Sequence, residues 1–77
     1  MNKTRRAEVE KAIALIEQAK GILENAAQEE RDYYDTMPEN MQGGDKGTKA
    51  DEAATALEEA ATACDEIVSG AQGAIEQ

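Results

Sequence analysis

The chain has 77 residues, no histidine, and an excess of acidic side chains that gives a net charge of −9. Its apolar side chains are small, since 15 of its 31 hydrophobic residues are alanine and it has no Phe or Trp. These numbers exclude a multidomain protein and a large core, and they favour a chain that buries further surface by self-association or against a partner.

The first half of the chain is predicted to form one long helix at about residues 4–35. Its seam positions are 9, 12, 16, 19, 23, 26, 30, 33 and 37, which alternate three and four residues apart with Glu30 as the only charged member. This spacing is typical of a coiled-coil seam. Further apolar residues widen the surface beside it, namely Ile13, Leu15, Ile22 and Ala27. We therefore expect the helix to touch more than one neighbour.

A polar connector at about residues 36–47 separates the two halves. Thr36 and Glu39 form a capping-box pattern, which predicts a short helical turn that ends at Gly43. Just before the connector stand two adjacent tyrosines, and neighbouring helix residues project about 100° apart. Only one tyrosine can face the seam, and the spacing predicts that Tyr33 does so while Tyr34 lies at a rim or against a partner.

Thr48 is predicted to begin the second long helix, at about residues 48–75, in a second capping pattern with Asp51. The seam repeats at positions 50, 53, 57, 60, 64, 67, 71 and 74, mostly as alanine, and the lone Cys64 is interpreted as a small buried member. The similar helix lengths favour an antiparallel pair. We predict an all-α fold in which a single domain, residues 1–77, forms an antiparallel, coiled-coil-like two-helix hairpin that assembles into a homo-oligomeric helical bundle.

Charge is unevenly distributed along the chain. Residues 1–11 carry four of the eight basic side chains, whereas the chain from Asp51 onward has seven acids and no base. A hairpin would lay the basic N-terminus beside the acidic helix. Alternatively, the acidic helix presents a phosphate mimic to a nucleic-acid-binding groove of another protein. The candidate acidic residues are Glu58, Glu59, Asp65 and Glu66. Direct binding to nucleic acid is not expected, because an acidic surface repels phosphates.

The connector and its flanks gather side chains suited to small polar ligands. Aromatic rings stack on bases, Arg and Lys pair with phosphate, and glycine lets backbone N–H groups approach a ligand. The candidate ligand-binding residues are Arg31, Tyr33, Tyr34, Met37, Asn40, Gln42, Gly43, Gly44, Lys46 and Lys49. Two interpretations stay open: a nucleotide-type ligand between subunits, or a structural role in which apolar bulk closes the end of the bundle. The apolar residues in question are Tyr33, Met37, Pro38 and Met41.

No catalytic constellation is present, because histidine is absent and the lone cysteine lies on a core stripe away from any base. The carboxylates match no EF-hand or Glu-x-x-His spacing, so we expect neither a metal nor a cofactor. No apolar run approaches the roughly 20 residues of a membrane span. A single cysteine fits a reducing compartment, so a cytoplasmic location is expected.

The stretch from Tyr34 to Gly43 reads Tyr-Asp-Thr-Met-Pro-Glu-Asn-Met-Gln-Gly. It resembles a Tyr/Phe-Asp-x-Met-Pro-Glu-Asn-Leu-Gln-Gly/Ser turn found inside the helical hairpins of short bacteriophage and prophage proteins. The resemblance implies a phage origin and a location in the host bacterial cytoplasm. Small phage proteins of this kind often antagonise a host protein, commonly one of defence. We therefore expect a non-enzymatic protein that binds and inhibits a host protein, with a sponge for a nucleotide immune signal or an acidic nucleic-acid mimic as alternatives.

Overall fold

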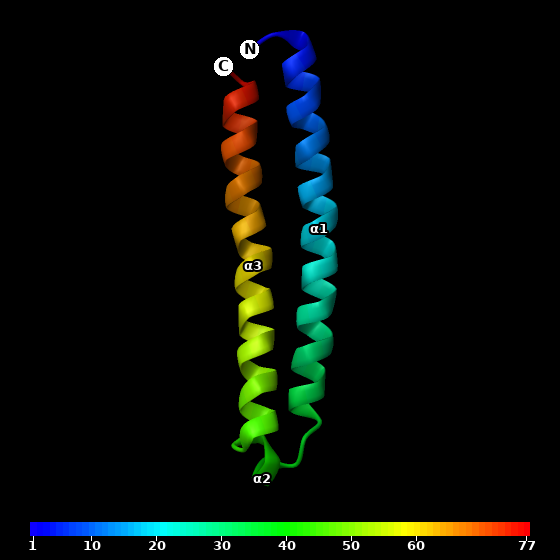
Figure 1. The fold of residues 1–77 in the computed structure, drawn as a ribbon, viewed down its shortest axis with the longest axis vertical. Coiled ribbons are helices and arrows are strands. Elements are labelled where there is room, and N and C mark those ends of the chain that lie inside the picture. The colour runs from blue at the N-terminus through cyan, green and yellow to red at the C-terminus, as the bar shows by residue number, and fades with distance from the viewer.

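The protein is a long antiparallel helical hairpin, described for all of residues 1–77 by a computed structural model (Figure 1). Its elements are α1 (Lys3–Asp35), α2 (Glu39–Gln42) and α3 (Asp45–Ile75). The rod measures 58 × 15 × 13 Å, with both termini at one end and α2 at the other. The predicted all-α hairpin with two antiparallel long helices is therefore confirmed.

The ends of α1 are held by local hydrogen bonds. The backbone N–H of Arg5 donates to the Asn2 side chain at 2.7 Å, which satisfies one free donor of the first turn. At the other end Thr36 is the C-cap, and its hydroxyl donates to the carbonyl oxygen of Tyr33 at 3.0 Å. The prediction that Thr36 caps the following helix is wrong, because α2 begins after Pro38 without a side-chain cap.

The third helix begins earlier than predicted, with Gly44 as its N-cap, so Thr48 lies inside the first turn instead of before it. Asp45 stands at the positive end of the helix, where a carboxylate is favourable. The short α2 ends at Gly43 as predicted. Gly47 is buried against the backbone of α2, and a Cβ there would overlap Gln42. The missing side chain thus allows the tight reversal.

The long helices meet along a seam of buried and half-buried positions that alternate three and four residues apart. These positions are 6, 9, 13, 16, 20, 23, 27, 30 and 34 in α1 and 47, 50, 54, 57, 61, 64, 68, 71 and 75 in α3. Every second member was predicted correctly, including the buried Cys64. The members between them lie one residue later than predicted. At most of these positions the predicted residue and the one after it are both apolar, so spacing alone does not decide which of the two turns inward.

The tyrosine prediction fails for the same reason. Tyr34 is half-buried on the seam, whereas Tyr33 is 51% exposed. The observed register brings Ile13 inward in place of Ala12 and Ile75 in place of Ala74, whereas Val68 turns inward and leaves the larger Ile67 exposed.

Gly47→Ala is expected to destabilise the hairpin by about 1–3 kcal/mol, because the new methyl group forces the first turn of α3 away from α2. Thermal unfolding followed by circular dichroism at one protein concentration measures the loss. Gly21→Ala is the matched control. A Cβ at Gly21 meets no atom within 4 Å, so this helix-interior change should be neutral or stabilising. Equal stability of the two variants would contradict the role given to Gly47.

Candidate functional site

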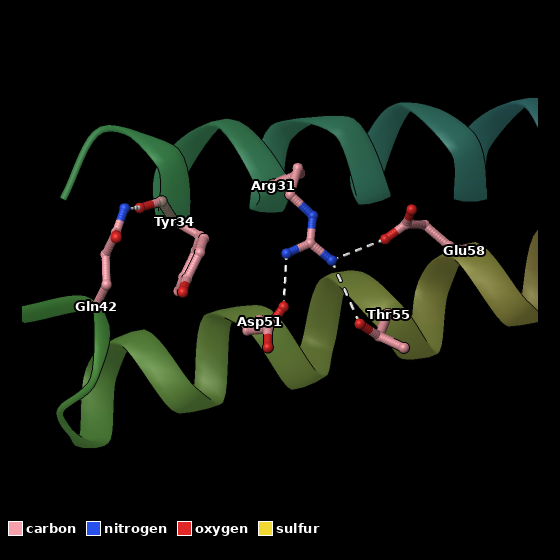
Figure 2. Close-up of polar contacts among 6 residues, drawn as sticks. All are labelled: Arg31, Tyr34, Gln42, Asp51, Thr55 and Glu58. Carbon is pink, nitrogen blue, oxygen red and sulfur yellow. Dashed lines mark hydrogen bonds and ion pairs between the residues drawn. The ribbon is translucent and has the colours of Figure 1, made fainter. Parts of the chain in front are cut away.

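One side of the rod is polar and is organised by Arg31, which reaches from α1 to α3 (Figure 2). Its Nη1 lies 2.6 Å from Asp51 Oδ1 and its Nη2 lies 2.9 Å from Glu58 Oε1. Nη2 also donates to the hydroxyl of Thr55 at 3.3 Å. The guanidinium carbon lies 5.8 Å from the ring centroid of Tyr34, within the range of a cation–π contact. Hydrogen bonds to Asp51 and then Glu58 raise the pKa of Arg31.

A second ion pair lies further along the same side. Lys20 Nζ donates to Asp65 Oδ1 at 2.7 Å, and this hydrogen bond is the main reason that the pKa of Lys20 is raised. Between the two cations runs an open groove. It is lined by Lys20, Glu24, Ala27, Gln28, Arg31, Glu58, Ala61, Thr62 and Asp65. We call this the ionic side of the rod.

The predicted pairing of the basic N-terminus with the acidic helix is only partly seen. Arg6 does reach α3, but its Nε donates to the backbone carbonyl of Ile75 at 3.0 Å instead of to a carboxylate. The ion pairs between the helices come from Lys20 and Arg31, in the middle and the connector half of α1. Hence the charge complementarity lies nearer the connector than the sequence predicted.

The connector residues predicted to bind a ligand are divided by the fold. Arg31, Tyr34 and Gln42 come together, and the polar side-chain groups of Arg31 and Gln42 bind within the chain, where Gln42 Nε2 donates to the backbone carbonyl oxygen of Tyr34 at 3.1 Å (Figure 2). Met37 is half-buried. The remaining predicted residues are exposed: Tyr33, Asn40, Gly43, Gly44, Lys46 and Lys49. The observed contacts of this cluster therefore brace the turn.

The predicted acidic residues also fall into two groups. Glu58 and Asp65 turn toward α1 and form ion pairs, whereas Glu59 and Glu66 are exposed and form none. Glu52 stands seven residues before Glu59 and is likewise exposed and unpaired. Sequence reasoning missed Glu52, although its heptad spacing from the other two was visible. These three carboxylates form a row along the edge of α3 that points away from α1.

The opposite side of the rod is apolar. We call it the outer apolar face, and it consists of Ala12, Leu15, Ala19, Ile22, Ala26 and Tyr33 on α1 and Ala53, Ala56, Ala60, Ala63, Ile67, Gly70 and Ala74 on α3. Glu29, seven residues after Ile22, lies on the same side and is exposed. Each of these residues directly precedes a seam position, whereas the lining residues of the ionic side that lie off the seam each follow one. In two antiparallel right-handed helices, residues that follow the seam share one side, as the pairs of Arg31 show. Those that precede it therefore share the other side.

The large side chains of this face are not covered by the hairpin. Ile22 is 70% exposed, and Leu15 and Ile67 are each 55% exposed. Of the four residues predicted to widen the apolar surface of the first helix, Leu15 and Ile22 lie uncovered, whereas Ile13 and Ala27 are buried in the seam. Large exposed apolar patches are uncommon on monomeric soluble proteins and are frequent at interaction sites.

No protein-family model, curated protein or solved structure matches this chain. The resemblance of the connector to phage proteins therefore stays a prediction. No helix combines the length and hydropathy that crossing a membrane requires. The fold also brings together no group of three or more acidic or cysteine side chains that could hold a metal ion.

Arg31→Gln is expected to lower the melting temperature, because it removes the only cation that joins Asp51 and Glu58 to α1. The loss should shrink between low salt and about 1 M NaCl, where exposed charges are screened. Arg5→Gln is the control, since the Arg5 side chain forms no ion pair. If both variants melted alike at low salt, Arg31 would not hold the helices together.

Proposed function

We propose that this protein is a non-enzymatic binding protein that works by packing its helices against other polypeptides. The observation that carries the proposal is the outer apolar face, where Leu15, Ile22 and Ile67 are each more than half exposed. An elongated hairpin with both long helices apolar on one side resembles half of a helical bundle. Its chemistry fits an amphipathic helical partner better than a small polar molecule.

We further propose a target protein in a bacterial host, with inhibition of that protein as the result of binding. The support is the Tyr-Asp-Thr-Met-Pro-Glu-Asn-Met-Gln-Gly turn, which resembles that of short phage proteins. The structure gives this turn a structural reason, because Gln42 and Thr36 both bond to the last turn of α1. The sequence motif thus serves to reverse the chain and set the two helices side by side.

Capture from a bacterial lysate tests the proposal when wild type is compared with two single-carboxylate variants. Ile22→Glu places a charge on the outer apolar face and should abolish capture, since a buried, unpaired carboxylate strongly opposes association. Ser69→Glu adds the same charge on the ionic side, where Ser69 is exposed, and should retain capture. Calorimetry with the purified captured protein verifies direct binding. Equal capture by both variants, or capture of no protein, would contradict the proposed function.

Acidic mimicry of nucleic acid is the second candidate, and the unpaired row of Glu52, Glu59 and Glu66 favours it. The successive carboxylates of this row are about 10 Å apart at 1.5 Å of rise per residue. A basic groove in a target protein would find them free, whereas Glu58 and Asp65 are already engaged.

If the row binds the target, binding by wild type should weaken as salt is added. Replacing all three residues of the row with lysine should then remove target binding. Glu8, Glu10 and Glu17 on α1 are the control set, because the same charge reversal there leaves the row intact. Titration of the captured protein at two salt concentrations measures the effect. Equal losses in both sets would show that net charge, and not the row, matters.

A further inference from the structure

We propose that a second copy of this chain covers the outer apolar face, forming a two-fold four-helix bundle with both connectors at the same end. This proposal rests on the proposed function, because both partners use the same face: the second copy covers it in the free protein, and a target protein would displace that copy. A two-fold axis parallel to the rod lays α1 of each copy antiparallel to α3 of the other, which is the neighbour relation already present inside the hairpin.

The ion pairs fix which residues meet. Lys20 lies level with Asp65, and Arg31 lies between Asp51 and Glu58, so α1 and α3 residues at one height have numbers that add up to about 85. Rotation about an axis parallel to the rod keeps every residue at its own height. A residue of α1 therefore meets the residue of the partner's α3 that lies at the same height in its own hairpin.

Applied to the outer apolar face, this geometry sets large side chains against small ones. Ile22 falls opposite Ala63 of the second copy, and Leu15 falls opposite Gly70. On the other helix, Ile67 falls opposite Ala19. Tyr33 likewise meets Ala53. Each large residue thus enters a gap between small ones, as in knobs-into-holes packing. The face is therefore complementary to itself in size, except where Glu29 falls opposite Ala56.

Charge also favours the arrangement with both connectors at the same end over the one with the connectors at opposite ends. The acidic row of Glu52, Glu59 and Glu66 comes to lie beside the partner's α1, whose edge at the same heights carries Asp32, Asn25 and Gln18, so only Glu52 meets a like charge. With the connectors at opposite ends, α3 would instead lie along the partner's α3. Six glutamates would then share one edge, and like charges at that distance repel.

The size of the face also fits a second copy. A side of a rod measuring 58 × 15 × 13 Å offers an area of roughly 800 Å². That is about the area which each partner buries in a standard protein–protein interface. Only seven residues are buried within the hairpin itself, and most of them are alanine, so the second layer adds Leu15, Ile22 and Ile67 to the core.

Sedimentation equilibrium over nanomolar to tens of micromolar concentrations tests the occupant. Wild type should sediment as a dimer, and Ile22→Glu should raise the dissociation constant at least ~100-fold, since two unpaired carboxylates would be buried. Ser69→Glu, on the ionic side, should leave the dimer intact. A well-folded wild-type monomer at tens of micromolar would overturn the proposal.

A size exchange tests the predicted pairing. Ile22→Ala leaves a gap and Ala63→Ile adds bulk opposite Ile22, so each alone should weaken the dimer, the first at least ~30-fold. The double variant should return to within about 10-fold of wild type, because the large and small residues have only traded places. Additive losses would overturn this pairing, and circular dichroism would show that each variant stays helical.

The relative direction of the two copies is measured with a spin label at Asn40→Cys in a Cys64→Ala background. Connectors at one end place the two labels within roughly 30 Å of each other, because neighbouring helices of a bundle lie about 10 Å apart. Connectors at opposite ends separate them by most of the 58 Å rod, which would overturn the proposed direction. If wild type is a monomer and Ile22→Glu still loses target capture, only the proposal of a second copy is overturned. A dimer that captures no protein would instead contradict only the proposed function.

Discussion

The contact of Arg31 with α3 is the interaction on which the arrangement of the two helices depends. Both long helices carry apolar residues over more than one seam, so hydrophobic burial permits more than one rotation of each helix about its axis. The ion pairs form only in a rotation that brings Arg31 of α1 close to Asp51 and Glu58 of α3. Exposed pairs of this kind add little free energy, but they discriminate between rotations that are close in hydrophobic burial.

The sequence predicts the elements and their direction well, because periodicity and helix length are properties of single segments. It fails at the rotation of the helices, where Tyr33 and Tyr34, or Ile67 and Val68, are equivalent by spacing. Which residue of such a pair turns inward depends on the other helix. The capping predictions fail because Thr36 ends α1 as its C-cap and α3 already begins at Asp45, before Thr48.

The candidate surfaces show the same division. The sequence indicated more apolar residues than one seam can hold. Only the ion pairs of the structure showed which of these residues lie together on one side of the rod. The four predicted acidic residues likewise looked equivalent until the fold engaged Glu58 and Asp65 and left Glu59 and Glu66 free. In the connector region, two of the predicted ligand-binding residues are already engaged, since Gln42 and Arg31 bind within the chain. Residue types identified the candidate binding groups, and only the structure showed which of them already bind other residues of the chain.

Alanine makes this design dependent on association. An alanine-rich seam lets the two backbones approach closely, but each buried methyl group contributes only about 0.8 kcal/mol, so the hairpin interior is thin. Leu15, Ile22 and Ile67 lie on the outer apolar face, where they stabilise the fold only when another polypeptide covers them. By mass action, any partner that binds the folded hairpin and not the unfolded chain raises its apparent stability. We therefore expect a substitution of Ile22 or Leu15 to lower the stability of the complex more than that of the isolated hairpin.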